Sequence, residues 1–260
     1  MQSLTQVASA DLGRAFAEIA EEAAELILPF WRTDLSVERK ADDSPVTEAD
    51  RRAEALILTR LAKLLPKVPV ISEEAASLTG VPAEVGRRFV LVDPLDGTKA
   101  FVRGAEAFTV NIGLIEDGAP VAGAVAAPAG GHLWFTTGEG AFRRKIRGND
   151  LTQIRVRPKP NEGVALVSHT LTDEEATRLA ARYRCPVWQG MDSSVKFCLI
   201  AEGRADIYPR PGRTMEWDTA AGDAVLRAAG GRTLTEAGSP LAYGKAAEGF
   251  ANPGFLAMGG

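Results

Sequence analysis

The chain has very few of the residues that bind soft metals or form disulfides. It carries two cysteines and two histidines in 260 residues. Cys185 and Cys198 lack the Cys-x-x-Cys spacing of zinc and redox sites, and His132 and His169 form no His-x-x-x-His pair. We therefore expect two reduced cysteines, and we expect any bound metal to have oxygen ligands rather than the nitrogen and sulfur ligands of zinc.

Long apolar runs and a strong excess of one charge are also missing. Thirty basic and 34 acidic residues give a net charge of −4, so no basic field favours a nucleic acid polymer or anionic lipid. No apolar run reaches the ~18 residues of a membrane span, and residues 1–16 contain no basic stretch followed by an apolar one. These absences predict a cytoplasmic protein with no integral membrane segment and no nucleic acid partner.

Two amphipathic helices are predicted in the first quarter of the chain. The spacing of apolar residues predicts the first over 10–31. A turn-rich loop, KADDSPVTEAD at 40–50, precedes the second helix. Thr47 and Asp50 match the Ser/Thr-x-x-Asp/Glu capping pattern, so this helix should start at Thr47 and stop at Pro66.

The order of the remaining elements favours an α+β half followed by an α/β half. Extended segments are predicted at 68–71, 88–93, 108–116, 120–128 and 132–137. Asp117-Gly118 is a hairpin signal, which indicates antiparallel pairing. After a linker at 155–163, strands and helices alternate. We expect a largely antiparallel sheet with helices on one face in residues 1–155, and a smaller α/β sheet in residues 156–260.

Acidic residues stand at the ends of predicted strands and the starts of predicted helices. They are Asp50, Glu73, Glu74, Asp93, Asp96 and Asp218. Carboxylates at such places can converge, and their repulsion pushes each of them toward protonation unless a cation is present. Mg²⁺ prefers oxygen ligands, and two such ions can hold the attacking and leaving oxygens of a phosphoryl transfer. The pattern therefore indicates a magnesium site for phosphate chemistry.

Each of these acids also has an ordinary structural interpretation. Three lie where an aspartate caps a helix or occupies its first turn, namely Asp50, Asp96 and Asp218. Glu73 and Glu74 alone would belong to a solvated loop. Asp93 is harder to explain in this way, because it directly follows the apolar run FVLV, where Pro94 should halt the ladder.

Two motifs resemble the signatures of the lithium-sensitive, magnesium-dependent phosphatase superfamily that includes inositol monophosphatase and fructose-1,6-bisphosphatase. The family pattern Asp-Pro-Ile/Leu-Asp-Gly-Thr stands here as DPLDGT at 93–98, and Trp-Asp-x-Ala-Ala-Gly as WDTAAG at 217–222. ISEE at 71–74 and VTEAD at 46–50 match further family elements. The resemblance covers nearly the whole chain. It implies a layered α/β/α/β/α sugar-phosphatase fold and inhibition by lithium, and it is compatible with a monomer or a homodimer.

The resemblance also implies a ligand set for two to three Mg²⁺ ions. One ion would be held by Glu73, Asp93 and the carbonyl of Leu95. A second would be held by Asp93, Asp96 and Asp218. A third, weaker ion would be bound by Glu73 and water.

The same resemblance implies the catalytic roles. Thr98 paired with Asp50 would orient or deprotonate the attacking water, and the N–H groups of Gly97 and Thr98 would receive the phosphate. Glu73 would take part in catalysis through its metal ions. The implied mechanism is direct attack by a metal-activated water, without a phosphoenzyme.

Further stretches resemble the bacterial 3'(2'),5'-bisphosphate nucleotidase branch of this superfamily. They are Lys99 after DGT, FTVNIGLI, SSVKFCLIAEG, YPR at 208–210 and FANPGF. Ala100 departs from the branch, which usually has Glu there. The branch implies a small phosphate ester as substrate: the enzyme would remove the 3'-phosphate of adenosine 3',5'-bisphosphate, or of the corresponding phosphosulfate, in sulfur assimilation.

Four residues lie where the resemblance implies contacts to the nucleotide and its second phosphate. They are His169, Ser193, Lys196 and Arg210. A second phosphate needs cations and donors that a single-phosphate substrate does not. Three of them have structural alternatives, since Lys196 suits a solvated helix position, Ser193 an N-cap, and His169 a hydrogen-bonded turn.

Two other functions remain open at this point. The first is an inositol-1-phosphate, fructose-1,6-bisphosphate or histidinol phosphate phosphatase of the same fold, because members of one fold differ in substrate through a few pocket residues. The second is a catalytically silent regulator that binds phosphorylated metabolites. The intact acidic motifs argue against the silent regulator.

Overall fold

The protein, described here by a computed structural model, is defined over residues 9–33, 37–40 and 45–260. Residues 41–44, in the middle of the expected loop at 40–50, lie outside this description. Within the described ranges the chain forms seven α-helices, two short 3₁₀ helices and sixteen strands.

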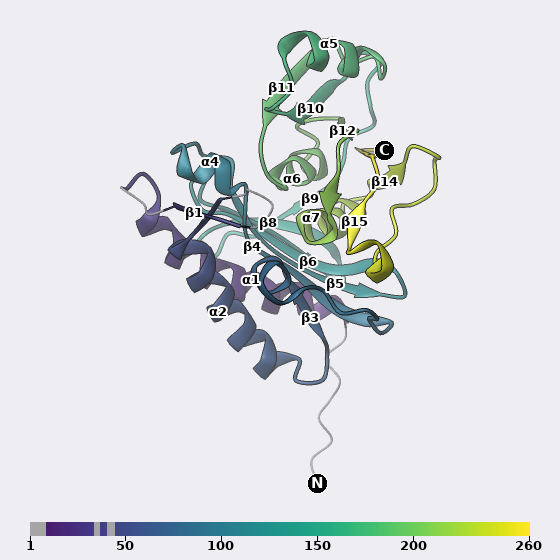
Figure 1. The fold of residues 1–260 in the computed structure, drawn as a ribbon. Helices are drawn as coiled ribbons and strands as arrows, with labels where there is room; N and C mark the ends of the chain where they lie inside the picture. The colour runs from purple at the N-terminus through teal and green to yellow at the C-terminus, as the bar shows by residue number, and fades with distance from the viewer. Residues whose placement is uncertain (1–8, 34–36, 41–44) are drawn as a thin grey trace.

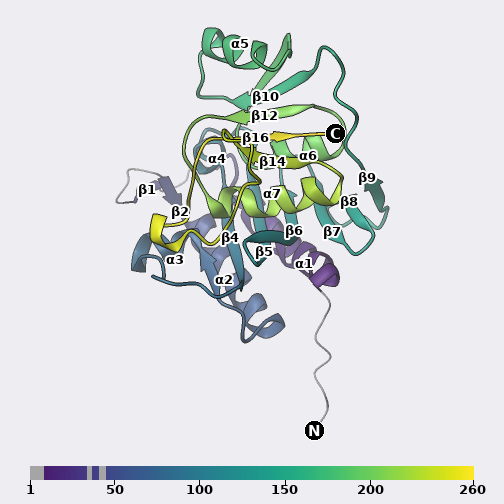
Figure 2. The ribbon, with the colours of Figure 1, turned by 90° about the vertical axis from the view of Figure 1, so that its right-hand side faces the viewer.

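The elements are stacked in five layers (Figures 1 and 2). Helices α1 (Ser9–Ile27) and α2 (Glu48–Leu64) pack on one face of a seven-stranded sheet. Helices α6 (Val195–Ala201) and α7 (Glu216–Ala228) lie between this sheet and a five-stranded sheet, whose outer face is covered by α5 (Asp173–Ala181). This order confirms the α/β/α/β/α layering expected from the sequence.

The larger sheet has the strand order β3-β4-β5-β6-β7-β8-β9. Its strands are β3 (Val70–Ser72), β4 (Arg88–Asp96), β5 (Thr109–Glu116), β6 (Ala119–Ala127), β7 (His132–Thr137), β8 (Gly140–Lys145) and β9 (Thr152–Ile154). β3 pairs with β4 in parallel, and every other neighbouring pair of this sheet is antiparallel. Asp117 and Gly118 both have positive φ, 51° and 77°, which confirms the tight β5–β6 turn predicted from Asp-Gly.

The smaller sheet has the order β11-β10-β12-β16-β14. Its strands are β10 (Val164–Ser168), β11 (Val187–Met191), β12 (Ile207–Arg210), β14 (Arg232–Thr235) and β16 (Phe255–Met258). β10 runs parallel to β11 and β12, and β16 runs antiparallel to β12 and β14. The remaining elements are the strand pairs β1 (Val37–Arg39) with β2 (Pro45–Thr47) and β13 (Thr214–Met215) with β15 (Ala251–Asn252), helices α3 (Glu73–Thr79) and α4 (Thr98–Val102), and 3₁₀ helices η1 (Leu28–Phe30) and η2 (Ala246–Glu248).

The first helix is shorter than its apolar spacing predicts. The prediction of a helix over 10–31 is wrong at its C-terminal end, because α1 stops at Ile27 and is followed by the 3₁₀ turn η1. Pro29 has no N–H for the helical hydrogen bond, and its ring clashes with the carbonyl four residues earlier. The second helix behaves as predicted, with Thr47 as N-cap and an end at Leu64, ahead of Pro66.

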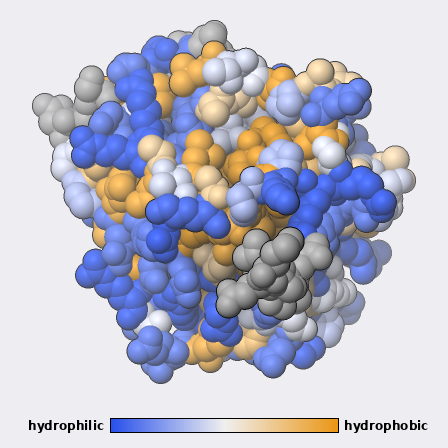
Figure 3. All heavy atoms as spheres, turned by 90° about the horizontal axis from the view of Figure 1, so that it is seen from below, coloured by the Kyte–Doolittle hydropathy of each residue, from blue (hydrophilic) through white to orange (hydrophobic). Residues whose placement is uncertain are grey.

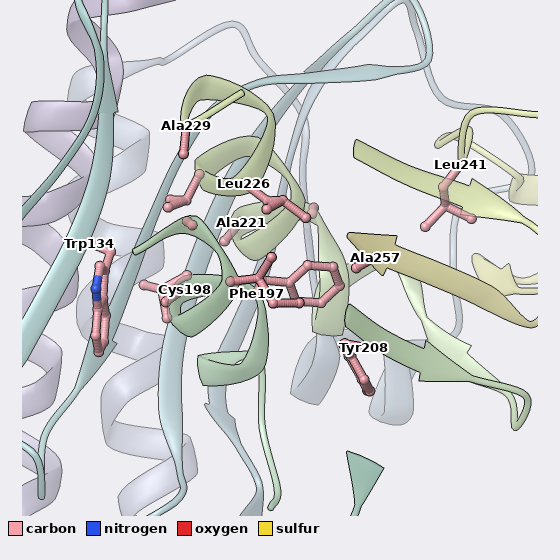
Figure 4. Packing of buried hydrophobic residues seen from close by; sticks show 14 of the residues in the cluster. Trp134, Phe197, Cys198, Tyr208, Ala221, Leu226, Ala229, Leu241 and Ala257 are labelled. Atoms are coloured by element: carbon pink, nitrogen blue, oxygen red, sulfur yellow. The ribbon is translucent and has the colours of Figure 1, made fainter. Parts of the chain in front are cut away.

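Small residues let α7 lie unusually close to its neighbours. A Cβ atom on Gly113 of β5 would come within 2.9 Å of the backbone of Ala220 and Ala221. A Cβ atom on Gly222 would come within 2.7 Å of the ring of Phe197 on α6, which Figure 4 shows packed beside α7. The Ala-Ala-Gly part of the WDTAAG motif therefore has a packing role that brings α7, and the residues at its N-terminus, close to the larger sheet.

The segment at 155–163, the expected linker, is held against the rest of the protein by hydrogen bonds and an ion pair. Arg157 makes a bidentate ion pair with Asp206, at 2.9 and 2.8 Å, and the Val156 N–H donates to the carbonyl of Ala229 at 3.0 Å. One hydrophobic cluster also includes residues of both sheets, such as Phe89 and Tyr208. The division into residues 1–155 and 156–260 stays a prediction.

The two cysteines are free, as expected from their spacing in the sequence. Seen from below, hydrophilic residues cover most of the rim, and hydrophobic residues gather toward the middle (Figure 3). No helix within the described residues is long and apolar enough to cross a membrane. Cys185 and Cys198 are both buried and unpaired.

Replacing Gly113 should destabilise the fold through α7. Gly113→Ala adds a methyl group against backbone atoms that cannot rotate away, so we expect unfolding in urea to require about 1–3 kcal/mol less free energy. Gly86→Ala is the matched control, because a Cβ atom there would meet no atom within 4 Å. Equal midpoints for the two variants would contradict the close approach of α7.

Candidate active site

A pocket of about 330 Å³ opens where the C-terminal end of β4 meets the first turns of α3, α4, α6 and α7. Its lining includes acids on one part of the wall, among them Glu73, Asp96 and Asp218. It also includes the bases Lys196 and Arg210. The pocket therefore brings together most of the residues that the sequence predicts as functional.

The expectation that Pro94 halts the ladder is wrong, because β4 continues to Asp96 and forms a bulge at Pro94. Asp93 pairs with Asn111 and Asp96 pairs with Thr109, so three steps along β4 match two along β5. Pro94 cannot donate to the ladder, and the extra residue is accommodated as a bulge. The bulge places both aspartates at the same end of the strand, with the Leu95 N–H donating to Asp93 Oδ1 at 3.0 Å.

Glu73 lies beside β4 because β3 pairs with it in parallel. Ser72, the last residue of β3, is opposite Val92, and Glu73 follows as the first residue of α3. The interpretation of Glu73 and Glu74 as a solvated loop is wrong. Lys40 donates to Glu73 Oε1 at 2.6 Å and to Glu74 Oε1 at 2.7 Å, and its own side chain is only 7% exposed.

Asp50 and Asp218 cap their helices, as the structural interpretation predicts, but each uses one oxygen to do so. Asp50 Oδ2 accepts from the N–H and hydroxyl of Thr47, at 2.8 and 2.6 Å. Asp218 Oδ2 accepts from the Met215 N–H at 2.8 Å. Because a carboxylate has two oxygens, capping by one leaves the other available, and capping and a functional role are compatible in these residues.

Thr98 links the start of α4 to Asp50. Its hydroxyl oxygen lies 3.2 Å from Asp50 Oδ1 and 3.0 Å from the carbonyl oxygen of Leu95, so it can donate its proton to either. Gly97 precedes it in the left-handed region, with φ of 90°, and a Cβ atom there would lie 2.8 Å from the carbonyl of Ala107. Only glycine fits this position without strain.

Burial and the charges of neighbouring acids raise the pKa of three carboxyl groups at the site. Burial and then the charge of Glu73 and Asp96 raise the pKa of Asp93 well above its usual range, and a hydrogen bond shared with Glu73 adds to this. Burial and the charges of Asp96 and Glu73 do the same to the pKa of Asp218. For Asp96, burial outweighs the opposing effect of Lys196 and raises the pKa to about 6. Such mutual repulsion is what a bound cation would relieve.

The donor set fits a hard divalent cation, although the ligands are not fully assembled. Within residues 9–33, 37–40 and 45–260, no three acidic, histidine or cysteine side chains are arranged so that they could hold a metal ion as they stand. Glu73 is engaged by Lys40. The nearby donors are carboxylate and carbonyl oxygens, which suit Mg²⁺ rather than zinc.

Lys196 is buried, so the interpretation as a solvated helix position is wrong. Its side chain lies over the ring of Tyr208, and its Nζ donates to the carbonyls of Met191, at 3.1 Å, and Ser193, at 2.6 Å. Burial lowers the pKa of Lys196 to about 8, against the raising effect of Asp96. Ser194, rather than Ser193, occupies the N-cap position of α6.

Arg210 at the end of β12 has a buried donor without a partner. Its Nε makes no hydrogen bond in the described part of the chain. Arg210 lines the same pocket as Lys196 and Asp218; its charge adds to the lowering of the Lys196 pKa by burial and opposes the rise in the Asp218 pKa that burial causes. A buried polar atom without a partner calls for an explanation, and an anionic ligand would supply one.

Both ring nitrogens of His169 have protein partners, as the interpretation of a hydrogen-bonded turn histidine predicts. Its Nδ1 pairs with Asp192 Oδ1, and its Nε2 lies 3.0 Å from Arg103 Nη2. Arg103 also pairs with Asp192 at 3.0 Å. His169 still lines the pocket, but both of its ring nitrogens already have protein partners.

Sequence reasoning missed several polar residues that surround the site. They are Lys40, Arg103, Thr109, Asn111, Asp192 and Ser194. Thr109 and Asn111 had a readable signal, because polar residues are unusual in an apolar strand such as FTVNIGLI. The partners of Lys40 and Arg103 could not be read from the sequence, since they lie 33 and 89 residues away.

Comparisons with known proteins agree with these features. A model of the inositol monophosphatase family matches residues 5–258. The 3'(2'),5'-bisphosphate nucleotidase CysQ of Salmonella typhimurium is 40% identical over 240 residues, which is 92% of this chain and 96% of that protein. The protein of the same name from Escherichia coli K12 is 39% identical, over 92% and 96% of the two chains. The crystal structure of CysQ from Bacteroides thetaiotaomicron, described as a bacterial member of the inositol monophosphatase family, has a TM-score of 0.77 and 32% identity, covering 96% of this chain and 97% of that one.

Removing the charge of Asp93 should stabilise the metal-free protein. The pKa of Asp93 is raised in the folded state. Between the unfolded pKa of about 4 and the higher folded pKa, the folded state therefore binds more protons than the unfolded state. Stability then falls as the pH rises through that window. Asp93→Asn cannot ionise, so we expect it to raise the free energy of unfolding by roughly 0.5–2 kcal/mol at pH 7.5 in EDTA, and to weaken its dependence on pH.

Asp117→Asn is the control for this measurement. Asp117 is exposed, and its ion pair with Arg87 lowers its pKa, so its replacement should not stabilise the protein. A metal-free Asp93→Asn protein that is less stable than the wild type at pH 7.5 would contradict the repulsion among the buried acids.

Proposed function

The chain belongs to the inositol monophosphatase family, and we propose that it acts as a 3'(2'),5'-bisphosphate nucleotidase that removes the 3'-phosphate of adenosine 3',5'-bisphosphate. The curated relatives named for this activity are 39–40% identical over 92% of the chain. The chain is accordingly a phosphoric monoester hydrolase whose substrate is a small phosphate ester. The expected fold and family, and the nucleotidase interpretation of the sequence, agree with these relatives.

The feature that carries the choice of substrate is a pair of cations, Lys196 and Arg210, in the pocket that also contains the acids. Arg210 has an unpartnered Nε, and Lys196 is buried beside it in the same pocket. A substrate with one phosphate at the acids would leave Arg210 Nε without a partner, and Lys196 with only the neighbouring acids and backbone carbonyls as partners. A second phosphate would meet them with charge-assisted hydrogen bonds, for which arginine is especially suited.

Members of the family are generally metal-dependent, and we propose two to three Mg²⁺ ions for this one. Glu73, Asp93, Asp96, Asp218 and the Leu95 carbonyl are the proposed ligands. When bound, such ions lower the pKa of water and neutralise charge on the leaving oxygen. Lys40 would then have to share Glu73 with a metal ion, because it now holds that carboxylate.

Asp50 and Thr98 are the proposed route for the proton of the attacking water. The Thr98 hydroxyl can accept that proton while it passes its own to Asp50 Oδ1, 3.2 Å away. Burial raises the pKa of Asp50, which makes it a better proton acceptor than an exposed aspartate. The N–H groups of Gly97 and Thr98 are the proposed donors to the phosphate, since the first N–H groups of a helix have no partner within it.

The other functions are less favoured. An inositol phosphate or histidinol phosphate phosphatase would not need the buried Lys196 and Arg210. A silent regulator is at odds with relatives named as nucleotidases and with the complete acidic set. Inhibition by lithium, a cytoplasmic location and the choice between monomer and homodimer stay predictions.

A panel of phosphate esters tests the proposed activity. With purified protein and Mg²⁺, we expect the largest kcat/KM for adenosine 3',5'-bisphosphate, measured by release of inorganic phosphate. Equal or faster hydrolysis of inositol 1-phosphate or histidinol phosphate would overturn the substrate assignment and leave the phosphatase activity in place.

Arg210→Met tests the second phosphate site directly. Loss of a charge-assisted hydrogen bond should lower kcat/KM for adenosine 3',5'-bisphosphate by roughly 10- to 100-fold, because such bonds contribute about 1.5–3 kcal/mol. Hydrolysis of adenosine 3'-monophosphate should change much less. Arg213→Met, at an exposed arginine on the same segment, is the matched control. Equal losses on both substrates would place Arg210 outside a second phosphate site.

A further inference from the structure

Three buried polar side chains form a chain of hydrogen bonds that ends at Asp96. Thr109 and Asn111 come from β5, and Ser194 comes from the turn before α6. All three are nearly inaccessible, at 0%, 0% and 2% exposure. Burial of polar side chains costs free energy unless they are hydrogen-bonded, so the hydrogen-bond partners of these three show what their burial serves.

The direction of each hydrogen bond follows from the donors available. Ser194 Oγ donates to Asn111 Oδ1 at 2.7 Å, so the 2.9 Å contact between Thr109 Oγ1 and Ser194 Oγ must be donated by Thr109. With its oxygen turned to Ser194, Asn111 presents its amide Nδ2 to Asp96 Oδ2, at 3.4 Å. The network therefore points donors toward the carboxylate.

The strongest contact to Asp96 comes from the same turn. The Ser194 N–H donates to Asp96 Oδ2 at 2.6 Å. The Ser194 N–H and the Asn111 amide both address this one oxygen of the carboxylate, which fixes its orientation. Ser193, the residue before, has an unusual positive φ of 57°, as expected for a turn that other contacts hold in place.

Lys196, one of the two cations of the proposed second phosphate site, directly follows this turn. Lys196 Nζ donates to the carbonyl of Ser193 at 2.6 Å. The next residue, Ser194, donates its N–H to Asp96. A displacement of the turn would therefore move a proposed metal ligand and a proposed phosphate ligand together.

We infer that Thr109, Asn111 and Ser194 are positioning residues that set the orientation of Asp96 for metal binding and couple the metal site to the second phosphate site. The inference about the phosphate rests on the proposed function. The inference about the metal rests on the proposed metal ligands but not on the choice of substrate. Coupling of this kind is reciprocal, so Mg²⁺ and the nucleotide raise each other's affinity by the same factor.

Thr109→Val removes the first donor of the chain while keeping the shape of the side chain. Mg²⁺ binding is measured by calorimetry without nucleotide, and we expect the affinity to fall about tenfold, as for other partners of metal ligands. Thr109→Ser keeps the hydroxyl and should restore most of the affinity. Binding of adenosine 5'-phosphate, with and without Mg²⁺, should show a smaller coupling factor in Thr109→Val than in the wild type.

Thr136→Val is the matched control for the loss of a buried hydroxyl. Thr136 lies in β7 of the same sheet, is 3% exposed, and accepts a hydrogen bond from the Gly123 N–H at 3.0 Å. Its replacement should leave Mg²⁺ binding unchanged, whatever it does to folding stability. Wild-type Mg²⁺ affinity in Thr109→Val, or equal losses in Thr109→Val and Thr136→Val, would overturn the inference.

Failure of the proposed function gives a different result. If adenosine 5'-phosphate does not bind the wild-type protein, the second phosphate site is wrong, while the Mg²⁺ affinities of Thr109→Val and Thr109→Ser still decide whether the network positions Asp96.

Discussion

The repulsion among buried carboxylates at the end of β4 is the constraint to which the rest of the site responds. Asp93 is buried and Asp96 and Asp218 are partly buried, and burial together with the charges of neighbouring acids raises the pKa of each. The surrounding protein supplies partial compensation through N–H donors to each of them and through Lys196. Lys40 does the same for Glu73. These partners hold the acids in place without replacing the divalent cation to which such a cluster is suited.

The packing of the fold brings these charges together from distant parts of the chain. The bulge at Pro94 places two aspartates at one strand end, and parallel pairing with β3 adds Glu73. Close contact between α7 and β5, permitted by Gly113, brings in Asp218. A charged cluster of this kind lowers stability on its own, so the large apolar clusters around it offset a cost that function imposes.

Much of this arrangement could be predicted from the sequence, because the acids and glycines occur in compact motifs at element ends. The capping pattern of Thr47 and Asp50 predicted the start of α2, and Asp117-Gly118 predicted a tight turn. The sequence could not show that Lys196 is buried, since that depends on the smaller sheet closing over α6. Contacts between distant residues, such as Lys40 with Glu73, leave no local pattern and needed the three-dimensional structure.

The central claim is that this cluster of acids binds divalent cations at the end of β4. The most direct test is anomalous diffraction from crystals grown with Mn²⁺ in place of Mg²⁺. The account predicts manganese peaks between the carboxylates of Glu73, Asp93, Asp96 and Asp218. Crystals without a peak among these four side chains, at manganese concentrations that support phosphatase activity, would contradict it.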